Sequence, residues 1–323
     1  MKRIPNQFNT KAFTLIELLT VIAIISVLVG IMAIGMRKAT ITAKNLRQKA
    51  ELKAMDIGLE LFSKDFDGYP FSNQIPVDGG QVICGAQRMA EALVGRDGYG
   101  VEPQTGWYPP NDKVYNPLVP ADLYDASVQA SLRRRKGPFV EFKYSGIYTI
   151  QELWGGSGGT SIYPSIPNPT TQQAYTRSPV ITDVFNKNQI TINSESVKVG
   201  LPVLYYRANE AKPFRIDNQR ALVSDPTLQQ AEKWVYNYYD NKELVNLPVL
   251  SDPSYPDMDF VNPEAPTGTL DTQRAQRFYE IITQTAQPDR DYYKSFNANT
   301  FILISAGYDG VYGTKDDITN FNY

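Results

Sequence analysis

The clearest pattern in this chain is an uninterrupted apolar run near its amino terminus. Residues 18–36 read LLTVIAIISVLVGIMAIGM and contain no charged side chain. As an α-helix these 19 residues span about 28 Å, close to the thickness of the hydrocarbon core of a bilayer. A buried helix of a soluble protein is the alternative, but such a helix usually keeps one polar face and this run does not. The pattern therefore predicts a membrane-spanning helix.

Beyond the run, the pattern becomes amphipathic. Residues 37–66 contain no Pro and are rich in Lys, Arg, Glu and Ala, which favour a helix. Apolar residues recur at steps of three and four and form one stripe, made of Leu52, Met55, Leu59, Phe62 and Phe66. The sequence DFDGYP ends the helix, because Gly68 can take a positive φ and Pro70 cannot continue a helix. We therefore predict one long helix over residues 13–66, with residues 13–36 as its transmembrane part.

The rest of the chain predicts a globular head of mixed helix and strand. Short runs of apolar, β-branched and aromatic residues predict strands at 139–144, 146–150, 197–207 and 301–305, and a helix at 86–94. Pro and Gly are frequent between these segments, and residues 154–170 read as a long loop. The predicted fold class is α+β: the long helix packs on a small antiparallel sheet in a head of residues 67–323, which carries a large loop-rich insertion at about residues 85–295.

Composition and charge exclude several classes of function. The chain has 32 basic and 34 acidic residues, so its net charge of −2 offers no general attraction for the phosphates of a nucleic acid. It contains no His, which excludes His-dependent catalytic triads and His-ligated zinc. Cys84 is the single thiol, so no intrachain disulfide forms, and without a His to activate it this residue is more typical of a buried apolar position. We expect no enzymatic site.

The charge at the amino terminus indicates targeting. Residues 1–12 hold three basic side chains and no acid, and the apolar run follows. A cleavable secretory signal peptide matches poorly, because its apolar core is usually about 7–15 residues and its small cleavage residues follow the core, whereas Ala12 precedes it. Glu17 stands at the edge of the run, where a carboxylate is costly in lipid and needs a partner. The alternative is a juxtamembrane Glu that reaches the headgroups.

Residues 11–17 read KAFTLIE, and with the basic leader and the apolar run this segment resembles the processing site of type IV pilins and of the pseudopilins of type II secretion systems. The resemblance implies that a prepilin peptidase cuts between Ala12 and Phe13 and methylates the new amino terminus. Ala12 stands where the family usually has Gly, and keeps a small side chain at the site. Glu17 becomes the fifth mature residue and is expected to pair with the free amine of Phe13 on a neighbouring subunit.

The same resemblance implies a structural function. The chain would be stored in the bacterial inner membrane as a single-pass protein, and an assembly platform protein and an ATPase would extract it. It would polymerise through its amino-terminal helix into a periplasmic or extracellular filament, together with other minor pseudopilins. The segment DGYP after the long helix is a further similarity to pseudopilins. The alternative is a membrane-tethered periplasmic enzyme or binding protein that uses the helix only as an anchor.

The carboxyl-terminal segment is a candidate for cation binding. Residues 305–320 read SAGYDGVYGTKDDITN, with three glycines that favour a tightly winding loop. Calcium takes oxygen ligands from carboxylates and from main-chain carbonyls, but the spacing does not match an EF-hand. The segment is similar to the calcium loop of the major pseudopilin, and this implies Asp309 and Asp316 as ligands, with Asp317 next. Asp317 can equally cap a turn, and an acidic, solvated hairpin tip is the alternative for the whole loop.

One further cluster stands out by its charge. Residues 133–136 read RRRK within an otherwise acidic body, and this pattern favours a solvated loop. A docking patch for an acidic neighbour or for surface polysaccharide is the other interpretation.

Overall fold

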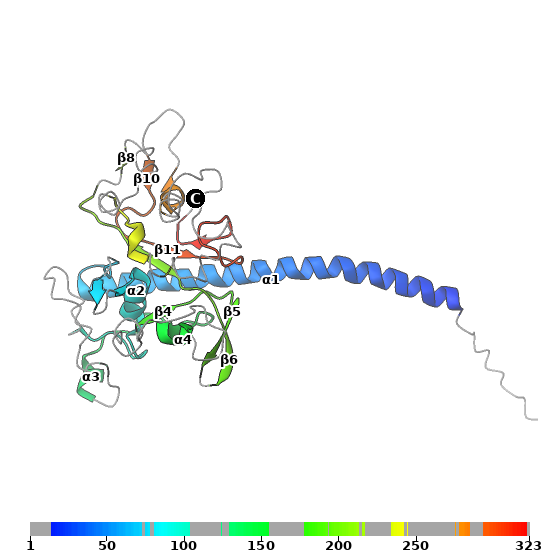
Figure 1. The fold of residues 1–323 in the computed structure, drawn as a ribbon, viewed down its shortest axis with the longest axis horizontal. Helices are drawn as coiled ribbons and strands as arrows, with labels where there is room; N and C mark the ends of the chain where they lie inside the picture. The colour runs from blue at the N-terminus through cyan, green and yellow to red at the C-terminus, as the bar shows by residue number, and fades with distance from the viewer. Residues whose placement is uncertain are drawn as a thin grey trace, which may run out of the picture. The chain divides into compact units, whose positions relative to one another are not determined.

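The computed structural model describes residues 14–72, 75–77, 81–103, 124, 129–154, 178–192, 194–212, 215–216, 234–241, 244, 275, 278–284 and 293–321. It divides into two compact units, Met1–Ala43 and Lys44–Tyr323. The fold is α+β, with a long amino-terminal helix and small antiparallel sheets, as the sequence predicts (Figure 1).

The helices are α1 (Leu15–Phe66), α2 (Gly85–Val94), α3 (Gln129–Arg134), α4 (Ile150–Trp154) and the 3₁₀ turn η3 (Tyr238–Asn241). The strands are β1 (Ile75–Val77), β2 (Gln81–Ile83), β3 (Ile147–Thr149), β4 (Pro179–Ile181), β5 (Asn188–Ile192), β6 (Glu195–Val199), β7 (Leu204–Arg207), β8 (Arg215–Ile216), β9 (Thr283–Gln284), β10 (Tyr293–Ser295), β11 (Phe301–Ser305) and β12 (Ile318–Thr319). Their sheets are β1–β2, β3–β4, β5–β6, β8–β10–β9 and β12–β11–β7.

The second half of α1 buries the predicted apolar stripe. Its five members, Leu52, Met55, Leu59, Phe62 and Phe66, are each at most 3% exposed. Three of them share a cluster with Met89 and Leu93 of α2 and with Phe301 of β11. This burial confirms the amphipathic reading, because one face of a surface helix must cover apolar area to be stable.

The sheet β12–β11–β7 is antiparallel and both of its faces are buried. Phe301 and Leu303 of β11 lie in the cluster that includes Leu52, Met55 and Leu59 of α1, and Ile302 and Ile304 lie in the cluster around Tyr206 and Phe278. Successive side chains of a strand point to opposite faces. The continuous apolar run of this strand therefore reflects two covered faces, as the sequence predicts.

Side chains bond to the main chain of β7. Asn241 Nδ2 donates to the carbonyl of Tyr205 at 2.7 Å, and the N–H of Arg207 donates to Ser72 Oγ at 3.0 Å. Asn241 Oδ1 also accepts the N–H of Ala86 at 2.8 Å, at the start of α2. These bonds join the turn after α1, helix α2 and η3 to the central sheet.

The end of α1 follows the prediction with one change of residue. The helix ends at Phe66, the left-handed residue of the cap is Asp67, with φ 54°, and Gly68 after it also has a positive φ, of 155°, as predicted. The N–H of Gly68 donates to the carbonyl of Ser63 at 3.1 Å, the six-to-one bond of a Schellman cap. Asp tolerates the left-handed region better than most residues, so the cap forms one residue earlier than expected.

Two strand predictions need correction. Residues 197–207 form parts of two strands, β6 and β7, which pair with β5 and β11. Residues 139–144 form no strand: the N–H of Phe139 donates to the carbonyl of Leu93, and the N–H groups of Lys143 and Tyr144 donate to Glu51 Oε1. These three N–H groups therefore bond to acceptors outside any sheet and do not take part in strand pairing.

Helix α2 and strand β7 both fall within residues 85–295, the range predicted as an insertion, and both contribute to the core. The predicted domain boundaries themselves stay a prediction.

Candidate functional site

The first turn of α1 holds Glu17 in a capping box. Thr14 N and Thr14 Oγ1 both donate to Glu17 Oε2, at 2.8 and 2.7 Å, and the N–H of Glu17 donates to Thr14 Oγ1 at 3.3 Å. A Thr three residues before a Glu satisfies two of the otherwise unpaired N–H groups of a helix start. Ala12 and Phe13, the predicted cleavage and methylation residues, lie outside the described residues.

This capping box is a role of Glu17 that the sequence analysis missed. The signal was present as the spacing T-x-x-E directly before an apolar run. It gives the carboxylate a local partner in the single chain, so Glu17 does not depend on a neighbouring subunit to be hydrogen-bonded.

The following apolar segment is exposed along the described side chains of residues 15–32. Leu15, Ile24 and Ile31 are each at least 60% exposed, and the other large apolar side chains of this segment are also exposed. By length and composition α1 is able to cross a membrane. Soluble monomers rarely expose a continuous apolar surface of this size, so this segment needs lipid or protein around it.

The carboxyl-terminal loop brings two of the three predicted acids together. The N–H of Asp309 donates to Asp316 Oδ2 at 2.8 Å. Thr314 Oγ1 lies 2.8 Å from Asp309 Oδ2 and 2.6 Å from Asp316 Oδ1. Since one hydroxyl carries one proton, one of these two contacts requires a further proton or a cation. Burial and the adjacent Asp316 carboxylate raise the pKa of Asp309 to about 7.

Asp317 is placed differently. Its Oδ2 accepts the N–H of Gly313 at 2.8 Å, as a capping residue does, and burial raises the pKa of Asp317 well above its usual value. Its Oδ1 is buried without a hydrogen-bond partner among the described residues. The structure therefore brings Asp309 and Asp316 together and turns Asp317 toward the main chain.

The loop supplies part of the donor set that a cation needs. In the part of the chain that the structure describes, no three Asp, Glu, His or Cys side chains lie close enough to share a metal ion. The loop instead offers two converging carboxylates and a hydroxyl. The carbonyl of Asp316 packs against Gly307, where an added Cβ would lie 2.2 Å from its oxygen. All-oxygen donors of this kind fit Ca²⁺ and no softer metal.

The loop is tied to the rest of the head on two sides. Asn320 accepts the N–H of Leu303 through Oδ1 at 2.8 Å and donates through Nδ2 to Asp56 Oδ1 of α1 at 3.0 Å. Tyr308 meets Phe185 edge to face, with ring centroids 6.4 Å apart, and Lys187 Nζ lies 4.4 Å from the centroid of the Tyr308 ring. Ordering of the loop is therefore coupled to helix α1 and to strand β11.

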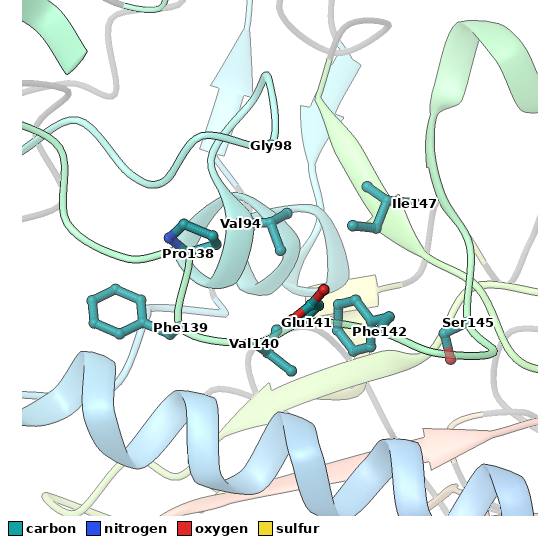
Figure 2. A pocket seen from close by; sticks show the side chains of 9 residues that line it. All are labelled: Val94, Gly98, Pro138, Phe139, Val140, Glu141, Phe142, Ser145 and Ile147. Atoms are coloured by element: carbon teal, nitrogen blue, oxygen red, sulfur yellow. The ribbon is translucent and has the colours of Figure 1, made fainter.

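A hollow of about 530 Å³ lies between α2 and the segment 138–147 (Figure 2). Figure 2 shows the segment running between α2 and α1, with Val94 and Ile147 among the lining side chains. The ionisable group in the lining is Glu141, and Ser145 contributes a hydroxyl. This lining does not gather the set of converging polar groups that an active site uses.

The basic cluster at 133–136 is not simply a solvated loop. Arg135 is bonded to Asp97, with its side chain only 1% exposed, and Arg134 Nε lies 3.4 Å from Glu102 Oε1. Tyr124 lies beside Arg135, whose Cζ is 5.0 Å from the ring centroid. These pairs correct the sequence interpretation in part: Arg134 ends helix α3, and Arg134 and Arg135 pair with acids that are remote in the sequence. Arg133 and Lys136 are exposed, as that interpretation expects.

Comparison with protein families finds the prokaryotic N-terminal methylation motif at residues 8–33. This motif is the hallmark of type IV pilins and pseudopilins, and it confirms the resemblance inferred from KAFTLIE. No curated protein matches the chain, and no solved structure matches it. The motif supports a type IV pilin-like or pseudopilin precursor, and the apolar helix fits membrane anchoring before assembly.

Replacement of the capping hydroxyl tests the first-turn geometry. Thr14→Ala removes the side-chain contacts of Thr14 and costs about 1 kcal/mol of local stability. In detergent micelles we therefore expect the amide of Glu17 to exchange about fivefold faster with solvent. Thr14→Ser keeps the hydroxyl and serves as the matched control. Unchanged exchange in Thr14→Ala would show that the box does not form.

The raised carboxyl pKa values predict an unusual pH dependence. Burial raises the pKa of Asp183 and of Asp240 to about 7, as it does for Asp309. A carboxyl with a higher pKa in the folded chain than in the unfolded chain stabilises the fold at low pH, and this stabilisation is lost as the pH rises through the folded value.

The unit of residues 44–323 should therefore melt at a higher temperature at pH 5 than at pH 8 in the absence of divalent cations. Asp309→Asn should reduce this difference, because it removes one of the carboxyl groups whose pKa is raised. A calorimetric series across this range measures the effect. A melting temperature that rises from pH 5 to pH 8 would contradict the raised pKa values of these carboxyl groups.

Proposed function

We propose that this chain is the precursor of a structural subunit of a type II secretion pseudopilus or of a type IV pilus-like filament. The observation that carries the proposal is the methylation motif at residues 8–33, which directly precedes and overlaps the exposed apolar part of α1. A subunit of this kind performs mechanical work through polymerisation and needs no active site of its own.

In this proposal a prepilin peptidase cuts between Ala12 and Phe13 and the new amino terminus of Phe13 is methylated. Thr14 and Glu17 then lie at the second and fifth mature positions. Before assembly the Glu17 carboxylate accepts hydrogen bonds from Thr14. In the filament it pairs with the amine of Phe13 on a neighbouring subunit, which neutralises two charges in a core that contains little water.

The change of surroundings drives assembly. In the bacterial inner membrane lipid tails cover the apolar part of α1, and in the filament copies of the same helix cover it. A platform protein and an ATPase supply the extraction, and other minor pseudopilins share the filament in the periplasm or outside the cell. This scheme rests on the one apolar helix and the motif.

The carboxyl-terminal loop is proposed to bind Ca²⁺ through Asp309 and Asp316, with main-chain carbonyls completing the oxygen set. When bound, the ion supplies the positive charge that two converging carboxylates otherwise lack. Asp317 fixes the loop through the N–H of Gly313, and Asn320 connects the loop to Asp56 of α1.

Loss of the charge at Glu17 tests the filament proposal. Glu17→Gln should leave cleavage after Ala12 intact but lower filament yield by about a hundredfold or more, because an unpaired buried amine costs about 3–5 kcal/mol. Co-expression with a prepilin peptidase, mass spectrometry and filament counts by electron microscopy give the two readouts.

Glu195→Gln, which neutralises an exposed acid on β6, is the matched control and should assemble normally. If Glu17→Gln assembles as well as this control, the proposed pairing is wrong. If the unchanged chain is neither cut nor polymerised by a competent host, the helix is only a tether.

Chelation tests the cation proposal on the unit of residues 44–323. Calcium should raise its melting temperature, and more at pH 8 than at pH 5, because protonation of Asp309 competes with the ion. Asp309→Asn combined with Asp316→Asn should abolish the response, whereas Asp65→Asn, which alters an exposed acid, should retain it. Equal melting with calcium and with chelator would exclude the site.

A further inference from the structure

A basic and aromatic cluster lies on the surface of the head beside α1. Arg47 Cζ of α1 is 4.9 Å from the centroid of the Tyr144 ring, and Lys143 Nζ is 5.2 Å from the same centroid. All three side chains are exposed. We call Arg47, Lys143 and Tyr144 the Tyr144 patch. Two cations at this distance from one aromatic ring are attracted to its negative face, and this attraction holds them near each other.

The patch is fixed by a buried acid. Glu51 is only 4% exposed, and its Oε1 accepts the N–H of Tyr144 at 2.8 Å and the N–H of Lys143 at 3.2 Å. Glu51 lies one turn beyond Arg47 on α1. A surface loop would ordinarily move independently, but these bonds attach the main chain of residues 143–144 to the helix. The patch is therefore preorganised.

The charge around the patch is concentrated along a short stretch. Residues 37–53 hold six basic residues and one acid, a net charge of +5, whereas the whole chain carries −2. Apolar side chains adjoin the patch in the sequence: Leu46 is 64% exposed and Ile147 is 41% exposed. Exposed cations, an aromatic ring and flanking apolar groups are the composition of a membrane–water interface.

Few residues separate the patch from the apolar run. Arg47 lies eleven residues after Met36, the last residue of that run. A charged membrane surface attracts cations over about one Debye length at physiological ionic strength. The sequence therefore places the first cation of the patch close after the membrane-spanning run.

The orientation of the chain does not account for this charge. Basic residues usually gather on the cytoplasmic side of a membrane-spanning helix, yet here the dense cluster follows the span, on the side of the head. A head exported from the cytoplasm carries this cluster against the usual tendency. Lys44 donates to the carbonyl of Phe185 and Lys53 lies 3.8 Å from Asp56 Oδ2, so another interaction is sought for the remaining basic residues.

We propose that the Tyr144 patch binds the headgroups of anionic phospholipids in the leaflet that faces the head. Arg47 and Lys143 contact the phosphates, and the Tyr144 ring enters the headgroup layer between them. This contact orients the head against the membrane in the stored subunit and must break when the subunit is extracted. This inference rests on the proposed function, in which the apolar part of α1 lies in a membrane.

The test uses the full chain reconstituted into vesicles. Ile147→Cys provides a labelling site beside the patch, and the native thiol can stay because Cys84 is fully buried. A fluorophore on this site is quenched by a lipid that carries a nitroxide on its headgroup. Vesicles contain phosphatidylcholine alone, or phosphatidylcholine with one third phosphatidylglycerol.

We expect stronger quenching with phosphatidylglycerol than without it, and a loss of the difference at high salt. Arg47→Gln combined with Lys143→Gln should lower the equilibrium constant for binding of the patch to the anionic headgroups about 25-fold, at about fivefold for each charge. Lys64→Gln removes an exposed cation near the far end of α1, and should behave like the unchanged chain.

Three results would overturn the proposal. Equal quenching in both kinds of vesicle would exclude a preference for anionic lipid. Equal quenching of the double variant and of Lys64→Gln would exclude the patch. Loss of filaments in the double variant without any change in quenching would assign the patch to a neighbouring subunit instead. Failure of the chain to float with vesicles at all would count against the proposed function, and so differs from the three results above.

Discussion

The structure depends on one constraint: a helix that is apolar over its first part carries a single carboxylate that must always have a partner. In the isolated chain Thr14 supplies it, through a capping box that the helix start would need in any case. In the proposed filament the amine of Phe13 supplies it. Because the two partners differ, Glu17 can stay satisfied in lipid and still pair more strongly when a neighbour arrives.

The second half of the same helix organises the head. Its buried stripe packs on α2 and on the strand β11, and polar side chains on its other faces reach outward to fix loops. Glu51 holds the main chain at residues 143–144, and Asp56 accepts a hydrogen bond from Asn320 at the end of the carboxyl-terminal loop. The cation loop and the Tyr144 patch are thus both connected to α1, which in the proposed function is the element that moves from membrane to filament.

Sequence predicted the parts that follow from local patterns. The apolar run, the stripe from Leu52 to Phe66 and the strand at 301–305 are each set by periodicity and burial, and the structure confirms them. The choice of Asp309 and Asp316 came from the resemblance of the carboxyl-terminal segment to a calcium loop, and the structure brings these two side chains together. Other contacts join chain segments that are far apart in the sequence, and no local pattern encodes them. Examples are the ion pair of Arg135 with Asp97 and the hydrogen bond from the N–H of Tyr144 to Glu51. The capping box of Thr14 and Glu17 was local and was overlooked because the motif already gave Glu17 another role.

The most direct measurement is an image of the assembled filament at side-chain resolution. The account predicts that residues 1–12 are absent, that the apolar helices form a central bundle, and that the Phe13 amine of one subunit lies within about 4 Å of the Glu17 carboxylate of the next. A filament in which the leader is retained, or in which Glu17 remains bonded only to Thr14 while every Phe13 amine faces water, would contradict it.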